Sequence, residues 1–484
     1  MKHRLLRLSP RSVRNFTSAL VLFQVLAVAT ASAQSAHLVR ISSDPFSNSG
    51  FQHATEVEPD TFAFGSTMVA TFQQGRRYSG GGASDIGFAT ATNNGTHLTN
   101  GSLPGITTVV GGNFQAASDP SVAYDSAHGV WLIASLGINS ATTVLVSRST
   151  DGGIHWNNPV TVNDTSSYAD KDWIVCDNNS GSPFLGHCYV EWDDAGIGGL
   201  VEISTSTDGG LSWSAPNTSA SAYGLGGQPV VQPNGTVIMP FEGNGIQSIR
   251  STNGGQTWSS PVTVSSIYFE GVGGELRTSP LPSAEIDGAG RVYVAWEDCR
   301  FRSGCSSNDI VFSSSSDGVT WSAVTRVPTD PVTSTIDHFI PGLAVDPNTT
   351  GANAHLALTF YAYSDANCNS STCKLYAAYT ESADAGKTWT HAWVLAGPMN
   401  VTWLANTDQG YMVGDYISTS FFNDRPFGVF AKAVAPVGGK FNEAMYTALP
   451  LAGPATLRAG GEQQLYFVEA KTPLPEIGEE DFLP

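Results

Sequence analysis

The sequence of 484 residues predicts an all-β fold, namely a single β-propeller built from four-stranded blades. One observation is a short phrase that recurs along the chain, with Ser, Asp or Asn, Gly and usually Trp at fixed positions. A second is the set of short runs of β-branched and aromatic residues around each copy. A third is the composition, because 51 Gly and 41% hydrophobic residues are typical of a turn-rich β protein.

Four copies of the phrase are complete and read STDGGIHW from Ser149, STDGGLSW from Ser206, STNGGQTW from Ser251 and SADAGKTW from Ser382. Two copies are weaker and read SSDGVTW from Ser315 and ATNNGTHL from Ala91, where Leu98 replaces the Trp. Their Asp or Asn residues are spaced by 45 to 67 residues, a period typical of repeat architectures such as propellers. An Asp or Asn before Gly favours a tight turn, and the Trp would pack that turn onto the sheet.

The clearest unit places the phrase between the third and fourth strands of a blade. Its strands are expected at SAEID from Ser283, VYVAW from Val292, DIVFSSS from Asp309 and AVTRV from Ala323. The first two strands of such a unit recur seven times, which favours seven blades, and six blades with longer loops are the alternative. The last unit lacks the phrase, so we expect it to be completed by residues 464–470 and by residues 37–42 as an outer strand.

The two ends of the chain are predicted to lie outside the propeller. Residues 1–33 are typical of a signal peptide, because a basic stretch precedes a short apolar run and the small residues Ala31-Ser32-Ala33. We expect the propeller at 34–470, an acidic C-terminal tail at 471–484, and a secreted protein, extracellular or periplasmic. A single N-terminal membrane anchor is the alternative.

The six cysteines form three pairs that are close in sequence. We predict disulfides for Cys176 with Cys188, Cys299 with Cys305, and Cys368 with Cys373, which agrees with an oxidising compartment. Zinc is the rival interpretation, but no Cys-x-x-Cys pair and no His at ligand spacing accompany them.

The charge balance limits the partners. The chain has 23 Lys and Arg against 42 Asp and Glu, a net charge of −19, which argues against nucleic acid. We expect a monomer with no membrane contact after signal cleavage. No nucleotide-binding or zinc-protease motif occurs, so no cofactor is expected.

The repeated phrase resembles the Asp-box, or bacterial neuraminidase repeat, of sialidases and their relatives. The stretches DKDWIVCD from Asp170, EPDTFAF from Glu58 and GDYISTSF from Gly414 are similar to those of secreted sialidase-like proteins. This resemblance implies a glycan or glycoconjugate partner and a sialidase-like glycoside hydrolase. A non-catalytic propeller that binds glycans or proteins is the alternative, and a polysaccharide lyase is a third. Sialidases carry an Arg-Ile-Pro motif; because the nearest string here is Arg40-Ile41-Ser42, no catalytic residue is carried over by motif.

The predicted propeller topology indicates where a catalytic site would lie. Loops that follow the second strands, or that lead into the next blade, open on the face opposite the repeated phrase. Glycoside hydrolysis needs two carboxyl groups, for which we select Glu297 and Asp193. Candidates for an anionic group and for sugar platforms are Arg76, Arg277, Arg300, Trp192 and Tyr361. Loops leading into the next blade add further charged residues, among them Asp119, Asp170, Lys171 and Asp415.

Several of these residues also have purely structural interpretations. Glu297 and Asp298 could form a loop ion-pair cluster with Arg300 and Arg302 beside a disulfide. Asp193 and Asp194 could bind a structural calcium ion or cap a turn, and no other metal is expected. Trp192 could pack between blades. The run Asp170–Trp173 could be an ion-paired start of a strand.

Overall fold

The computed structural model describes residues 38–165 and 168–448, and within them nearly all regular structure is β-strand. Short 3-10 turns occur at η1 (Thr108–Val110), η2 (Ala195–Ile197), η3 (Ser303–Cys305), η4 (Gly351–Asn353) and η5 (Val401–Trp403). The predicted signal peptide and acidic tail lie outside the described residues. No helix in the described part of the chain is long and apolar enough to cross a membrane.

The first sheet has eight strands and consists of two antiparallel meanders. Its strands are β2 (Glu56–Phe64), β3 (Thr67–Arg76), β4 (Ala83–Thr92), β5 (His97–Ser102), β6 (Ala116–Asp125), β7 (Val130–Ile138), β8 (Thr142–Ser149) and β9 (Val160–Asn163). The two meanders join where Ala83 of β4 pairs with Ala117 of β6.

The next sheet has three strands, β10 (Ala169–Cys176), β11 (Cys188–Asp194) and β12 (Leu200–Ser206). The segment outside β12 contacts it only through isolated bridges, Ile203 with Asn217 and Leu200 with Tyr223. It therefore does not form a fourth strand.

Three four-stranded sheets follow. The first contains β13 (Val230–Val231), β14 (Val237–Gly243), β15 (Gly245–Ser251) and β16 (Val262–Ser265). The second contains β17 (Ser283–Ile286), β18 (Val292–Asp298), β19 (Asp309–Ser315) and β20 (Thr325–Arg326). The third contains β21 (Asp337–Val345), β22 (Leu356–Tyr363), β23 (Lys374–Ser382) and β24 (Trp393–Asn400).

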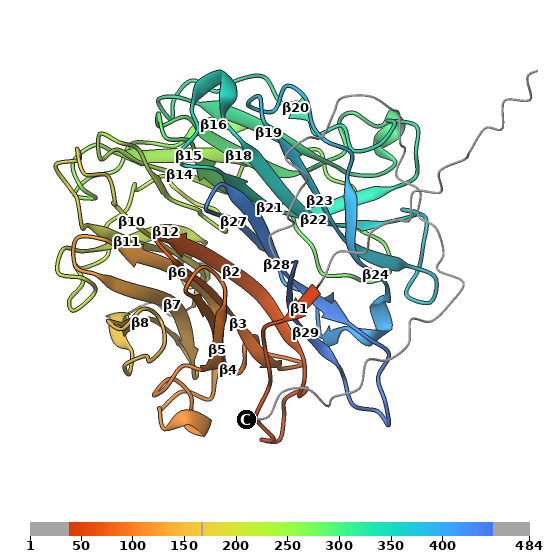
Figure 1. Ribbon diagram of the computed structural model, residues 1–484, viewed down its shortest axis with the longest axis horizontal. Coiled ribbons are helices and arrows are strands. Elements are labelled where there is room, and N and C mark those ends of the chain that lie inside the picture. Colours follow the sequence, from red (N-terminus) through yellow and green to blue (C-terminus); the bar gives the residue numbers. More distant parts are fainter. Residues whose placement is uncertain (1–37, 166–167, 449–484) are drawn as a thin grey trace, which may run out of the picture. The chain divides into compact units, whose positions relative to one another are not determined.

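The closing sheet combines both ends of the described chain. It contains β27 (Ser418–Phe422), β28 (Arg425–Ala433), β29 (Glu443–Ala448) and β1 (Leu38–Arg40), after a small hairpin of β25 (Ala405–Thr407) and β26 (Gly410–Met412). Figure 1 shows the red N-terminal β1 beside the blue β29, so the predicted N-terminal outer strand is confirmed. The third strand is β29, where the sequence had suggested residues 464–470, which lie outside the described residues.

The first strands of these units form a ring. Strands β2, β6, β10, β13, β17, β21 and β27 contact one another in that order, and β27 contacts β2. The all-β propeller arrangement is thus confirmed. The prediction of seven separate four-stranded blades is wrong. The first two meanders share one sheet, and the β10 sheet has three strands.

Each complete copy of the repeated phrase is a turn that follows the third strand of its unit. In the turn after β8, Asp151 Oδ1 accepts hydrogen bonds from the N–H groups of Ile154 (3.2 Å) and His155 (3.0 Å). The Trp156 ring then packs 5.8 Å from the ring of Phe88, which belongs to the preceding unit. The phrase therefore closes a hairpin and also joins neighbouring units.

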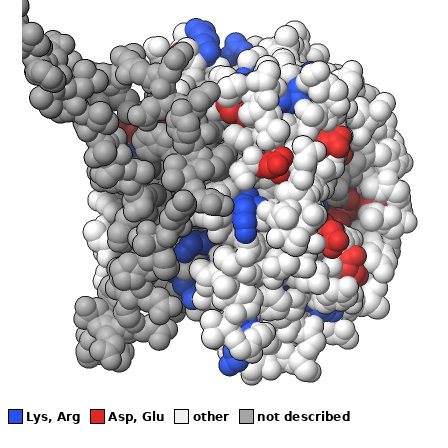
Figure 2. All heavy atoms as spheres, turned by 90° about the vertical axis from the view of Figure 1, so that its right-hand side faces the viewer, with Lys and Arg blue, Asp and Glu red and all other residues white. Residues whose placement is uncertain are grey.

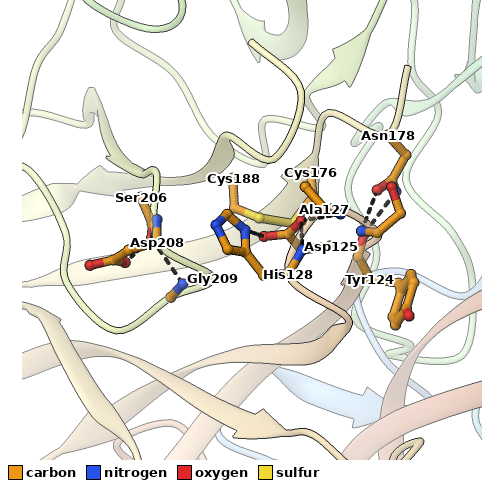
Figure 3. The surroundings of a disulfide bond; sticks show 12 residues. Tyr124, Asp125, Ala127, His128, Cys176, Asn178, Cys188, Ser206, Asp208 and Gly209 are labelled. Carbon is orange, nitrogen blue, oxygen red and sulfur yellow. Dashed lines mark hydrogen bonds and ion pairs between the residues drawn. A yellow bond between two sulfur atoms is a disulfide. The ribbon is translucent and has the colours of Figure 1, made fainter. Parts of the chain in front are cut away.

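The three predicted disulfides are confirmed. Figure 3 shows Cys176 and Cys188 bonded across the hairpin of β10 and β11, near the turn that carries Asp125 and His128. In that turn the imidazole of His128 lies 2.6 Å from the Asp125 carboxylate. This disulfide closes the hairpin on the side of the repeated turns.

Candidate functional site

Three first strands begin with a bulge that places a charged residue in the left-handed backbone region. The φ angles are +55° at Glu58, +50° at Asp119 and +53° at Lys171. The pairing register of β2, β6 and β10 shifts at these same residues. Such angles are uncommon for residues other than Gly and gather at functional sites. The repetition at one position in three units marks one end of the strand ring.

Ion pairs join these residues across the ring. Lys171 Nζ lies 3.1 Å from Glu58 Oε1 and also pairs with Asp415, which precedes β27. Arg277, from the loop that leads into β17, pairs with the same Asp415 oxygen. We define the charged cluster as these residues together with the side chains that interact with them electrostatically: Glu58, Arg76, Asp119, Asp170, Lys171, Asp193, Arg277 and Asp415.

The central members of the cluster are almost fully buried. The exposed fraction of the side chain is 4% for Lys171 and 5% for Asp415, but 22% for Arg277. Arg277 is therefore the ion-paired cation that solvent reaches most easily. Its guanidinium is the side chain through which an anionic ligand could contact the cluster.

Neighbouring charges keep part of the cluster ionised. Burial alone would raise the pKa of Asp415, but Lys171 and Arg277 hold it below its usual value. Burial would likewise raise the pKa of Asp119, and Lys171 with the hydrogen bonds from Asp170 and Ser118 lowers it instead. These two carboxylates thus carry negative charge at neutral pH.

Two other carboxyl groups of the cluster have raised pKa values. Burial raises the pKa of Asp193 to about 8, and the neighbouring charge of Asp170 adds to this. Burial and the charge of Asp119 raise the pKa of Asp170 as well. A protonated and an ionised carboxyl group in one site are what proton-transfer chemistry needs.

A small cavity adjoins the cluster at the ring. Its lining comes from four units and comprises Lys171, Trp173, Gly226, Gly227, Gln228, Leu281, Pro282 and Tyr416. A Cβ atom at Gly227 would lie 2.7 Å from the Glu191 carboxyl carbon, so a larger residue there would have to displace that buried carboxyl group. The Tyr416 hydroxyl donates to the Pro120 carbonyl (3.1 Å), and burial raises its pKa well above the usual value. Tyr416 therefore acts as a wall and not as an ionised nucleophile.

Arg76, Arg277 and Asp193, which were selected from the sequence as site candidates, belong to the cluster. So do the four loop residues that the sequence analysis added, Asp119, Asp170, Lys171 and Asp415. Arg76 is 3% exposed, and burial lowers the pKa of its guanidinium. The charge of Glu58 raises this pKa and the charge of Arg277 lowers it further. Its guanidinium donates to the Gly82 carbonyl.

The second catalytic candidate, Glu297, lies in other surroundings. It is fully buried and accepts a hydrogen bond from the Ile340 N–H (2.8 Å). Burial raises its pKa, and the carboxyl groups that add to this are Asp337 and Glu242. The groups that shift the pKa of Glu297 therefore differ from Asp170, Lys171 and Asp119, which shift that of Asp193.

Three substrate-binding candidates have structural partners. Arg300 pairs with Asp298 at 2.7 Å, whereas Arg302 pairs with Asp309 and Asp330, so only part of the expected loop ion-pair cluster is observed. Trp192 is fully buried and packs between β11 and the preceding unit. Tyr361 is fully buried, and its hydroxyl donates to the Ala431 carbonyl (3.0 Å). Neither aromatic ring is presented to solvent as a sugar platform.

No calcium geometry is seen at Asp193 and Asp194 among the described residues. Asp194 caps a turn, because its Oδ1 accepts from the Gly196 N–H (2.8 Å). Within the described part of the chain, one set of side chains lies close enough together to hold a metal ion, namely Asp309, Asp330 and His338. Arg302 and Arg326 already bridge these two carboxylates, so this group is an ion-pair network.

Glu58 is the cluster member that sequence reasoning missed. A usable signal was present, because Glu58-Pro59 and Asp119-Pro120 place an acid before Pro at the start of a first strand. Both acids occupy the bulge position described above.

Comparisons with known proteins give structural similarity only. No family model and no curated protein matches the chain. Similar solved structures include a Hadza microbial sialidase, with 14% identity over 82% of this chain and 67% of that one and a TM-score of 0.45. The intramolecular trans-sialidase from Ruminococcus gnavus has 14% identity over 66% and 93% of the two chains and a TM-score of 0.45. A polysaccharide lyase described as an ulvan lyase has 10% identity over 82% and 94%, with a TM-score of 0.49. Sialidases are thus among the solved structures to which this chain is similar.

Proposed function

We propose that this chain is a secreted, sialidase-like glycoside hydrolase that acts on a glycan ending in a carboxylated sugar. The observation that carries the proposal is the charged cluster, where a protonated acid, an ionised carboxylate and a partly exposed arginine meet at one end of the strand ring. Three disulfides support an oxidising compartment such as the exterior or the periplasm.

The cluster supplies each role that hydrolysis requires. Asp193, with its raised pKa, donates a proton to the leaving oxygen. Asp119, held ionised, is the second carboxylate and stabilises the positive charge that develops on the sugar ring. Water then attacks the anomeric carbon, and the Asp193 carboxylate takes up the proton that this water releases. Arg277 binds the carboxylate of the substrate, and Arg76 and Lys171 add positive charge behind it.

One observation favours a second candidate, a propeller that binds acidic glycans without cleaving them. Asp119 and Asp193 are each only 3% exposed, and Lys171 and Arg277 already have carboxylate partners. In a binding protein, Arg277 would contact the ligand and the buried carboxyl groups would only position it.

A screen of aryl glycosides separates the two candidates. The panel includes a sialoside and a glucuronide, tested for turnover with the wild type and with Asp193→Asn, Glu297→Gln and Arg277→Gln. We expect Asp193→Asn to lower kcat by roughly 100-fold or more and Arg277→Gln to raise KM.

Glu297→Gln serves as the comparison, because its buried side chain can still accept the hydrogen bond from Ile340. An equal loss in Glu297→Gln would restore Glu297 as a catalytic residue. Binding of an acidic sugar without turnover of any glycoside would favour the binding protein.

A further inference from the structure

Four tyrosines expose about half or more of their surface. They are Tyr78, Tyr168, Tyr223 and Tyr268, with exposed fractions of 53%, 62%, 48% and 55%. Tyr78 follows the second strand β3, and the others lie in loops that lead into β10, β13 and β17. All four loops therefore open on the face of the charged cluster. The repeated turns on the opposite face instead expose aliphatic residues such as Leu98, Leu211 and Val319.

Three of the four tyrosines share a loop with a cation of the cluster. Tyr78 is two residues from Arg76, Tyr168 is three residues from Lys171, and Tyr268 precedes Arg277 in the same loop. A fully extended chain of two or three residues spans at most about 11 Å. Tyr78 and Tyr168 therefore lie at the border of the cluster.

Backbone hydrogen bonds fix these tyrosines in place. The Tyr268 N–H donates to Asp298 Oδ2 (3.1 Å), and its carbonyl accepts from Cys299 (2.7 Å). The Tyr168 carbonyl accepts from Ala195 (2.9 Å), and the Tyr78 carbonyl accepts from Asp408 (2.9 Å). The backbone at these three tyrosines is thus held before a ligand arrives, which lowers the entropic cost of binding. The Arg300 guanidinium also lies over the Tyr268 ring, 5.2 Å from its centre, and leaves the other ring face for a ligand.

The exposed hydroxyls are free to bind a ligand. Within residues 38–165 and 168–448, none of the four makes a hydrogen bond, whereas the buried Tyr361 and Tyr416 hydroxyls do. A half-exposed Tyr offers an apolar ring face and a polar tip, which suits a sugar with its C–H face and hydroxyl groups.

We infer that Tyr78, Tyr168, Tyr223 and Tyr268 form a tyrosine rim that binds the neutral sugars of a glycan whose acidic end enters the charged cluster. The inference rests on the proposed function for the acidic end. The chain has a net charge of −19, which disfavours a polyanionic glycan at long range. The contacts that the rim makes are uncharged, so they favour neutral sugars next to the acidic end of the glycan.

Calorimetric titration tests the rim with two pairs of probes. One pair is N-acetylneuraminic acid and 3′-sialyllactose, and the other is glucuronic acid and a trisaccharide in which glucuronic acid ends a chain of two neutral sugars. We expect the wild type to bind the longer member of one pair more tightly. Replacing all four rim tyrosines by Ala should lower the affinity for the longer probe by roughly fivefold or more. The affinity for the monosaccharide should stay unchanged.

Two control variants make the result specific. Leu211→Ala, on the face of the repeated turns, should change neither affinity, and Arg277→Gln should weaken both members of the pair. If the rim variant binds both probes as the wild type does while Arg277→Gln fails to bind, the rim is overturned and the proposed function stands. If the wild type binds none of the four probes, both are overturned.

Discussion

At the scale of single residues, Lys171 is the side chain on which the charged cluster depends. Its ammonium group is buried and pairs with carboxylates from two other units, Glu58 and Asp415. An ionised carboxylate buried without a partner costs several kcal/mol. Burial alone would lower the pKa of Lys171, but Asp415 and Glu58 raise it above its usual value. The cation therefore stays charged and links three units of the ring.

We predict that Lys171→Met lowers the free energy of unfolding by about 3 kcal/mol, because two carboxylates lose their shared cation. Urea denaturation of the purified variant measures this change. The exposed Lys387 provides the control, since Lys387→Met should stay within about 0.5 kcal/mol of the wild type. Equal stabilities of the two variants would show that the ion pairs do not hold the ring.

At this scale the sequence predicts both the location of the site and most of the charged residues there, but not which of them meet. Loop position was enough to select Arg76, Arg277 and Asp193. It also selected Trp192, although neighbouring residues of a strand point to opposite faces and Trp192 enters the core. Bulges in three first strands decide which charges meet, and a bulge depends on pairing with a distant strand.

At the scale of elements, the repeated turns act as links between units, and one link is weak. The Trp156 and Trp389 rings pack 5.8 Å and 5.9 Å from aromatic rings of the preceding units. In the copy between β4 and β5 the residue equivalent to Trp is Leu98, which lies at the start of β5 and is 44% exposed. An apolar cavity lies there, lined by Leu98 and Val69 on one side and by Phe427 and Val429 of β28 on the other.

Filling this cavity should stabilise the protein. We predict that Leu98→Trp raises the free energy of unfolding by about 1 kcal/mol, because the larger ring buries additional apolar surface between the two units. Leu211→Trp is the matched control, since Leu211 is 58% exposed in an equivalent turn. Chemical denaturation of both variants measures this change. If Leu98→Trp is no more stable than Leu211→Trp, the interpretation of this contact as weak is contradicted.

Local elements follow closely from the sequence. The strands expected from Ser283, Val292 and Asp309 are observed as β17, β18 and β19 with the same first residues. The closing sheet was less predictable, because β29 pairs with β1, far away in sequence. Pairing of that kind is set by packing of the whole ring and leaves little local signal.

At the scale of the whole molecule, charged side chains are few and many carboxyl groups are buried. Charged residues make up 13% of the chain, and on the face shown in Figure 2 they stand scattered among uncharged residues. Burial raises the pKa of Asp60 and Asp337 to about 7 and that of Asp193 and Glu285 to about 8. The fold therefore keeps several acids protonated that would ionise in the unfolded chain.

Stability should consequently depend on pH. A carboxyl group with a raised pKa binds its proton more strongly in the folded state, so it stabilises the fold below its unfolded pKa, near 4. That stability is lost as the pH rises through 7 to 8. Asp119 and Asp415, whose pKa values are lowered, act oppositely and lose their contribution only in stronger acid.

We predict that Tm, measured by calorimetry at constant ionic strength, falls steadily between pH 5 and pH 8. Glu285→Gln should make this slope shallower, because it removes one raised carboxyl group. The exposed Glu275 gives a matched control, and Glu275→Gln should keep the wild-type slope. A Tm that rises over this range would contradict the assignment of protonated buried acids.

The central claim is that Asp193 is the proton donor of a glycoside hydrolase. The most direct test is how the loss of kcat/KM in Asp193→Asn depends on the leaving group. The measurement compares kcat/KM of the wild type and Asp193→Asn on two glycosides of the same acidic sugar. For a sugar leaving group, which needs protonation, the variant should lose roughly 100-fold or more. For a dinitrophenyl leaving group, which departs without a proton, it should lose less than about tenfold. A variant that retains wild-type kcat/KM on both glycosides would contradict the claim.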